Sequence, residues 1–269
     1  MGEAFVTRGV RVAWGPGGVC AGLAGLLAAG VFGSVLGFGS PAHAGAEEVA
    51  AESLRFDGPA GPESKCEDGI AERTVRAVQS RYDGIRDIRA VFEQTSESAT
   101  FGGAPMMSPG PKTGRVVFAK PGKMRWTYSA PEPSVVVSDG KTLWIHDVEG
   151  NNVTRLEVTA GFLSGAAVQF LLGDGQILDS FEVSAAACDD LHVTLDLAPR
   201  DESTYERLGL TATRVRAEIV GTSVLDLFGN LTVIRFSEIE TNRGPASDTF
   251  EFEVPDGVEL IDYAGSQGL

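Results

Sequence analysis

The sequence KPGKMRWTY at residues 120–128 decides the fold of this chain. After its Pro-Gly turn, Met124, Trp126 and Tyr128 fall on one side of an alternating segment, and Arg125 falls on the other. A period of two predicts a β-strand with one covered face. The segment therefore predicts a sheet whose buried side carries a thioether and two aromatic rings.

The segments on both sides of it form an antiparallel meander together with it, from Gly114 to Val158. Asp139-Gly140 is a tight hairpin signal, and residues 149–152 form the next turn. Between these two turns, Leu143-Trp144-Ile145 is apolar on both faces, which is typical of a strand covered on each side.

Helical spacing appears twice. From Asp68 to Tyr82 apolar residues recur every three or four positions among charged ones, and Gly84 ends the pattern. The helical period returns from Thr159 to Leu172, where Phe162, Phe170 and Leu171 lie on one side. We expect the second helix to cover the sheet.

Downstream segments again alternate as strands do. The strand patterns after the second helix are Ile177 to Val183, His192 to Ala198, Leu210 to Ile219, Ser223 to Leu227, Leu231 to Ile239 and Thr249 to Val254. With about eleven candidate strands and two helices, the chain is mainly β and predicts one large curled sheet or barrel.

The N-terminus has the layout of a secretory signal. Arg8 and Arg11 precede an uncharged run from Gly18 to Phe38, and Ala42-His43-Ala44 follows as a cleavage site. An uncut signal anchor is the competing interpretation. We expect a signal peptide at residues 1–44, a flexible leader at 45–67, one domain at 68–263 and a short tail at 264–269.

The charge of the chain excludes classes of partner. The net charge is −15, and removing residues 1–44 leaves 20 basic against 36 acidic residues, a formal charge of −16. Nucleic acid and anionic membrane surfaces are therefore excluded as expected partners.

Two cysteines, Cys66 and Cys188, remain after the predicted cleavage. Neither has the spacing of a metal site, so we expect no metal. In an oxidising compartment they could form one disulfide that closes a long loop, and two buried free thiols are the alternative.

The sequence contains no catalytic or nucleotide-binding motif that we recognise. After cleavage only His146 and His192 remain as imidazole bases, and both lie within strand patterns, where a solvated or hydrogen-bonded histidine is the ordinary interpretation. We therefore expect no enzyme, although a spatially assembled catalytic site is the competing hypothesis.

The ordered set of these segments resembles one known family. Residues 79–85 with 92–94, residues 114–128, residues 137–144, residues 226–230 and residues 250–258 are similar to the LolA family of periplasmic lipoprotein carriers. The resemblance implies an unclosed antiparallel β-barrel with a helical lid over a hydrophobic cavity, and no cofactor. It also implies a monomeric chaperone that takes acylated lipoproteins from an inner-membrane LolCDE-type transporter and delivers them to a LolB-like outer-membrane acceptor.

The stripe and the resemblance together define the expected site. The residues expected to bind lipid are Phe92, Met124, Trp126, Tyr128, Leu143, Ile145, Phe162, Phe170 and Leu171. Lys120 and Arg125 are expected to latch the lid or to contact a partner. The family often has Arg where this chain has Lys120, and Lys offers a point charge instead of a planar fork. A paralogous module that binds lipid or glycolipid, or that senses envelope stress, is the alternative function on the same fold.

Overall fold

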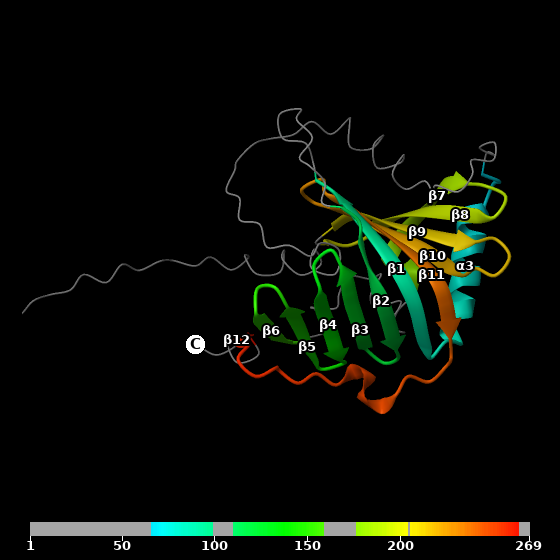
Figure 1. Ribbon diagram of the computed structural model, residues 1–269. Coiled ribbons are helices and arrows are strands. Elements are labelled where there is room, and N and C mark those ends of the chain that lie inside the picture. Colours follow the sequence, from blue (N-terminus) through cyan, green and yellow to red (C-terminus); the bar gives the residue numbers. More distant parts are fainter. Residues whose placement is uncertain (1–65, 99–109, 159–175, 204, 264–269) are drawn as a thin grey trace, which may run out of the picture.

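The computed structural model describes residues 66–98, 110–158, 176–203 and 205–263 (Figure 1). The expected signal peptide, nearly all of the expected leader, the expected helix from Thr159 to Leu172 and the tail lie outside these residues. Their assignments stay predictions.

One sheet of twelve strands forms the body of the protein. The strands are β1 (Asp87–Glu97), β2 (Lys112–Ala119), β3 (Lys123–Ala130), β4 (Ser134–Asp139), β5 (Thr142–Asp147), β6 (Asn152–Glu157), β7 (Phe181–Cys188), β8 (His192–Pro199), β9 (Tyr205–Thr213), β10 (Ile219–Asp226), β11 (Leu231–Thr241) and β12 (Glu259–Asp262). The described helices are α3 (Ile70–Asp83), the single turn α5 (Ile177–Ser180) and the 3-10 turn η1 (Ser247–Phe250). Among them, none has the length and apolar character needed to cross a membrane.

The order of the strands shows two meanders joined at one seam. The sheet runs β12-β6-β5-β4-β3-β2-β1-β11-β10-β9-β8-β7, so β1 and β11 connect the two halves (Figure 1). Neighbouring strands are antiparallel except β12 and β6, which are parallel. Because β12 and β7 are the two edges, the sheet is open. The expected unclosed sheet is confirmed, with twelve strands in place of about eleven and with one parallel pair.

Three of the predicted strands are wrong. The segment from Leu210 to Ile219 is interrupted, because β9 ends at Thr213 and Ala217 turns the chain with a φ of 50°. This turn contains neither Gly nor Pro, so it lacked the usual signal. The predicted strand from Ile177 to Val183 begins instead with α5, and β7 starts only at Phe181.

The predicted strand from Thr249 to Val254 belongs to a segment that crosses the outer face of the sheet. We call residues 243–262 the strap (Figure 1). The buried carboxylate of Asp87 accepts hydrogen bonds from the backbone amides of Arg243 and Gly244 at the start of the strap. The Phe252 ring then lies 6.2 Å from the ring of Trp144. The segment forms no strand until β12. Its alternating pattern instead places side chains in contact with one face of the sheet.

The helix α3 packs against the opposite, concave face of the sheet, beside β7 and β8. Its apolar stripe includes Val75 and Val78, which are fully buried, and its last turn carries the buried Tyr82. Gly84 caps the helix, so the predicted helix and its end are confirmed.

A disulfide between Cys66 and Cys188 ties the chain just before α3 to the end of β7. Of the two alternatives for these cysteines, the structure has the disulfide. The two residues are 122 positions apart, so in the chain-entropy model the crosslink stabilises the fold by about 5 kcal/mol.

Candidate functional site

The concave face carries a cluster of aromatic rings around Trp126. Phe92 meets Trp126 edge-on with ring centroids 4.8 Å apart, and it meets Tyr128 in the same way at 5.0 Å. Phe118 lies 5.7 Å from Trp126, and Phe236 lies 6.3 Å from it. We call these five residues the aromatic cluster. Such edge-to-face contacts add to the free energy of burial and fix the orientation of each ring.

Strand register brings the cluster together. On β1, Phe92 lies opposite Gly114 of β2 and opposite Phe236 of β11. A Cβ at Gly114 would lie 2.8 Å from the Phe92 ring, so only glycine leaves room for the ring at this position. The next concave position of β2, Val116, lies opposite Trp126 of β3.

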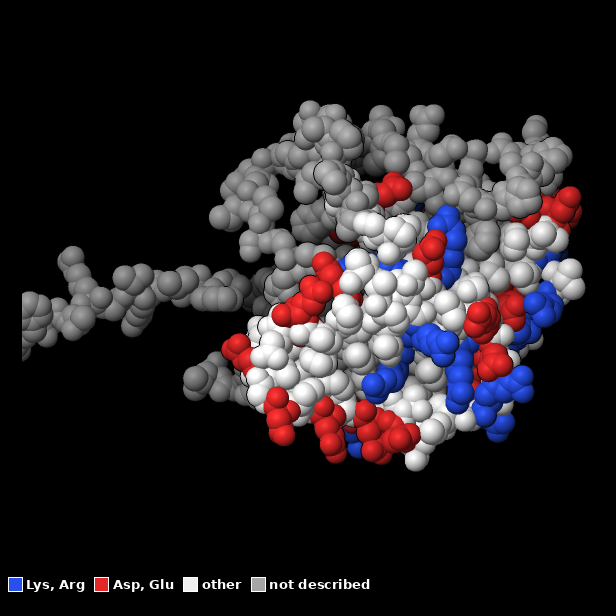
Figure 2. Space-filling view, in the orientation of Figure 1, with Lys and Arg blue, Asp and Glu red and all other residues white. Residues whose placement is uncertain are grey.

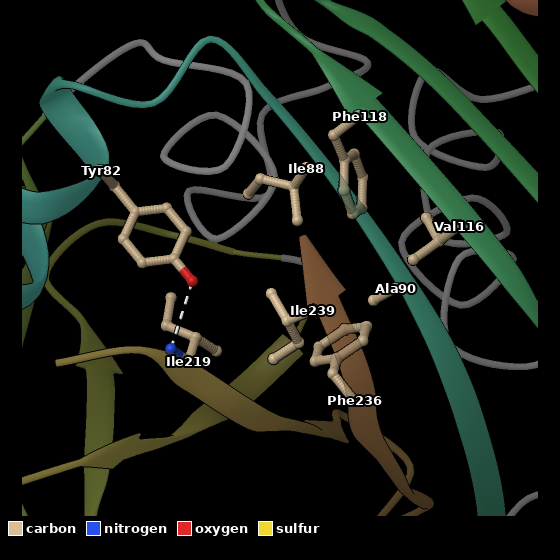
Figure 3. Close-up of a pocket in the computed structure, with 8 residues that line it drawn as sticks. All are labelled: Tyr82, Ile88, Ala90, Val116, Phe118, Ile219, Phe236 and Ile239. Atoms are coloured by element: carbon tan, nitrogen blue, oxygen red, sulfur yellow. Dashed lines mark hydrogen bonds between the residues drawn. The ribbon is translucent and has the colours of Figure 1, made fainter. Parts of the chain in front are cut away.

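A small apolar pocket adjoins the cluster beneath α3 (Figure 3). Figure 3 shows Tyr82 reaching in from the helix, and Phe118 and Phe236 entering from β2 and β11. The lining residues are Tyr82, Ile88, Ala90, Val116, Phe118, Ile219, Phe236 and Ile239. The free volume is about 20 Å³, which holds about one water molecule. An acyl chain therefore fits only if the walls move apart.

The buried hydroxyl groups of this face are paired and uncharged. The Tyr128 hydroxyl donates to Gln94 Oε1 at 3.0 Å, and the Tyr82 hydroxyl accepts from the Ile219 amide at 3.2 Å. Burial raises the pKa of each tyrosine to about 12. The indole Nε1 of Trp126 is different, because it is buried and has no hydrogen-bond partner within the described part of the chain. At neutral pH these hydroxyl groups are therefore uncharged, and the Trp126 Nε1 is an unpaired donor on the same face.

The structure brings together most of the residues expected to bind lipid. Phe92, Met124, Trp126, Tyr128 and Leu143 are buried in the same core cluster, and the half-buried Ile145 packs against it. Phe162, Phe170 and Leu171 lie outside the described residues. None of the eight residues lining the pocket was among the nine expected ones. The signal that could have found some of them was the alternation of Ile88, Ala90 and Phe92 along β1.

Lys120 bonds to α3. Its ammonium donates to the backbone oxygen of Tyr82 at 2.6 Å, so it holds the last turn of the helix against the sheet. Beside it, Arg81 of α3 forms an ion pair of 2.9 Å with Glu218, which is largely buried. With the disulfide before its first turn, α3 is fastened at both ends. The structure thus gives Lys120 a partner in α3, while the expected lid from Thr159 to Leu172 is outside the described residues.

Arg125 faces the convex side, away from its neighbours Met124 and Trp126. Its guanidinium donates to the backbone oxygens of Thr249 at 3.2 Å and Glu251 at 3.4 Å. These bonds attach the strap to β3. The sequence did not indicate this role, because nothing local to Arg125 reveals a segment that arrives from more than a hundred residues away.

The charged side chains of the visible face are unevenly distributed (Figure 2). Acidic side chains line the lower edge, where the strap runs, and basic side chains gather over the right half. The exposed acidic residues of the strap include Asp248, Glu251, Glu253 and Asp256. Acidic side chains are also scattered among the basic ones, and a largely uncharged area lies to their left.

The two histidines among the described residues, His146 and His192, have structural contacts. The ring of His146 lies 5.9 Å from the Phe252 ring under the strap, and His192 Nδ1 lies 3.4 Å from Asp189 Oδ2 at a turn. Across residues 66–98, 110–158, 176–203 and 205–263 there is no group of three or more His, Cys, Asp or Glu side chains that could hold a metal ion.

The chain is similar in sequence and in structure to known proteins. The family model described as "Outer membrane lipoprotein carrier protein LolA" matches residues 83–253. A relative from Cupriavidus taiwanensis named "Outer-membrane lipoprotein carrier protein" is 30% identical over 185 residues, covering 68% of this chain and 85% of the relative. A protein of the same name from Dechloromonas aromatica is 31% identical over 191 residues, covering 69% and 87%. Among solved structures, a LolA superfamily protein from Nitrosomonas europaea has a TM-score of 0.35 and 13% identity, covering 65% of this chain and 96% of that one.

Proposed function

This chain belongs to the LolA family of outer membrane lipoprotein carrier proteins, and from this premise we propose that it carries acylated lipoproteins through the periplasm. In this proposal the protein accepts its cargo from an inner-membrane LolCDE-type ABC transporter. It then delivers the cargo toward the outer membrane, to a LolB-like acceptor where one is present. It acts as a monomeric chaperone and performs no covalent chemistry.

The observation that carries the proposal is the apolar concave face under α3. The aromatic cluster and the pocket beside it are built from uncharged side chains, in a protein whose net charge is −15. Small-molecule sites are commonly concave and apolar in this way. Such a face suits hydrocarbon chains better than it suits a polar or ionic ligand.

The energetics explain why a carrier is needed and why its cavity must open. Each methylene kept from water is worth about 0.8 kcal/mol, so a cargo with several acyl chains cannot cross an aqueous compartment unshielded. A pocket of about 20 Å³ shields nothing of that size. We infer that loading moves part of the concave wall outward, and that the apolar surface so exposed is covered by the acyl chains.

The helix predicted from Thr159 to Leu172 is our candidate for the part that moves. Since α3 is fastened by the disulfide and by Lys120, it is the less suitable lid. Cargo that competes for the surface covered by Phe162, Phe170 and Leu171 would displace their helix, a shift set by the difference in affinity between the two states. Hydrogen exchange over Thr159 to Leu172 should then become faster on loading.

The proposed location rests on the N-terminal sequence together with the family. Basic residues, an apolar run and the Ala42-His43-Ala44 site form the layout of a secretory signal. The disulfide agrees with an oxidising compartment outside the cytoplasm.

A release assay tests the proposal. Proteoliposomes that contain the transporter and a lipoprotein would be incubated with ATP and the mature protein, and soluble lipoprotein would be measured. We expect release with the wild type and a strong loss with Phe236→Glu, which puts a carboxylate into the pocket wall. The matched control is Val91→Glu, on the convex side of the adjacent β1. Equal release by both variants, with intact thermal melting, would contradict a carrier that works through this face.

A further inference from the structure

We propose that Trp126 recognises the carbonyl group of the cargo lipid, with its indole Nε1 donating a hydrogen bond to a carbonyl oxygen. The protein would then distinguish acyl chains from alkyl chains of the same length. This inference rests on the proposed function and specifies which chemical group of the lipid the site recognises.

The first step is that the indole N–H lacks a hydrogen-bond partner, whereas the buried tyrosine hydroxyls of the concave face have one. Tyr128 is paired with Gln94, and Tyr82 is paired with the Ile219 amide. Within the described residues, the Trp126 Nε1 has no partner although the residue is only 5% exposed. Most buried polar side-chain atoms in proteins are satisfied, so this one calls for a reason.

The second step is the chemistry of the missing partner. An indole N–H only donates, so its partner must be an acceptor. The rings around it belong to the aromatic cluster, and the Tyr128 hydroxyl, which donates its proton to Gln94, is not hydrogen-bonded to the indole. Since no described group accepts a hydrogen bond from the indole, the acceptor is assigned to the ligand. The chains of an acylated cargo are joined through ester or amide carbonyls, which accept hydrogen bonds, whereas an alkyl ether has no carbonyl.

The third step is location. Phe118 and Phe236 flank Trp126 at 5.7 and 6.3 Å, and both line the pocket (Figure 3). A hydrocarbon chain that widens this pocket lies next to the indole. The rigid edge-to-face contact with Phe92 holds the indole in place, so the donor is oriented before the ligand arrives. One donor in an apolar wall fixes the orientation of a ligand without holding it too tightly to release.

The test compares two lysophospholipids that have the same head group and the same chain length. One carries an ester-linked hexadecanoyl chain, and the other carries an O-hexadecyl chain. Both would be titrated into the mature, disulfide-bonded protein with displacement of a fluorescent acyl probe. We expect the wild type to bind the ester about tenfold more tightly, the size of effect that one hydrogen bond in an apolar site produces. Trp126→Phe should bind the two lipids equally.

Two control variants distinguish the effect of the indole donor from the effect of losing an aromatic ring. Trp144→Phe makes the same substitution on the convex face, where Trp144 contacts Phe252, and it should keep the preference for the ester. Phe236→Leu removes an aromatic ring from the pocket without removing a donor. It should weaken the binding of both lipids by the same factor.

A spectroscopic measurement tests the same inference on protein that keeps Trp126, so its result does not depend on whether a Trp126 variant folds. The mature chain has two tryptophans, Trp126 and Trp144, so the nitrogen–proton NMR spectrum has two indole signals that Trp144→Phe assigns. The ester should move the Trp126 signal downfield, and the ether should not. An equal preference for the ester in wild type and Trp126→Phe, or equal shifts with the two lipids, would overturn the inference while leaving the carrier function intact. Failure of the wild type to bind either lipid would overturn both.

Discussion

Replacing Lys120 by methionine should release the C-terminal end of α3 from the sheet. The ammonium donates to the Tyr82 backbone oxygen at 2.6 Å in a partly buried setting, and the same oxygen also accepts a hydrogen bond from the Ile85 amide at 3.1 Å. Methionine keeps the apolar stem of the side chain but removes the charge and the donor. The change therefore tests the contact itself more than it tests packing.

The magnitude follows from the kind of bond. A hydrogen bond with a charged partner contributes about 1.5–3 kcal/mol, and a cation near a helix C-terminus adds about 0.3–1 kcal/mol. We expect the free energy of unfolding to fall by about 2–3 kcal/mol. In a domain of this size that lowers the Tm by about 4–12 °C.

Urea unfolding at pH 7 measures the change in free energy, and hydrogen exchange shows where it acts. Exchange across Ile70–Asp83 should become faster in Lys120→Met, while exchange in β11 should not change. The control is Lys141→Met, which alters an exposed lysine in the turn between β4 and β5. If the two variants unfold at the same urea concentration, Lys120 does not hold α3 and the reasoning is wrong.

Two further predictions concern the concave face. Gly114→Ala should destabilise the fold by about 3 kcal/mol or more in urea unfolding, because the new Cβ would collide with the backbone of β3 and lie 2.8 Å from the Phe92 ring. The control is Gly110→Ala, where the space is open. Equal stability of the two variants would show that the ring can move aside. Alkaline pH should also weaken the fold. Because burial raises the folded-state pKa of Tyr82 and Tyr128 from 10.0 to about 12, their contribution is complete below pH 10 and is lost as the pH rises toward 12. Urea midpoints measured between pH 8 and 11 should fall above pH 10, and they should fall less in the double variant with phenylalanine at both positions.

The direction of the side chains within single strands was predictable from the sequence. Met124, Trp126 and Tyr128 lie on the covered face because a strand alternates with a strict period of two. The helix ending at Gly84 was predictable for the same kind of reason, since its apolar spacing and its terminating glycine are local. These features depend on neighbours a few residues apart, which a sequence displays directly.

The pocket and the strap were not predictable in this way. The pocket depends on β1 lying beside β11, and Phe92 and Phe236 meet only because that pairing takes one particular register. The strap alternates as a strand does, with Phe250 and Phe252 pointing the same way, but it packs on a sheet without joining its ladder. Both features arise from contacts between distant parts of the chain, for which local patterns contain no information.

The seam between β1 and β11 also affects the time that the chain needs to fold. The first six strands form one run of consecutive hairpins, and β7 to β11 form another, so each half can assemble from local contacts. The halves join only when β1 pairs with β11, with Ile88 opposite Thr241, and this pairing closes a loop of about 150 residues. Topologies dominated by such distant pairings fold slowly, in about milliseconds to seconds. During that interval the inner edges of both halves are unpaired, and unpaired edges are where chains stick to one another. A newly made molecule is therefore most prone to aggregate after its hairpins have formed and before its seam has closed.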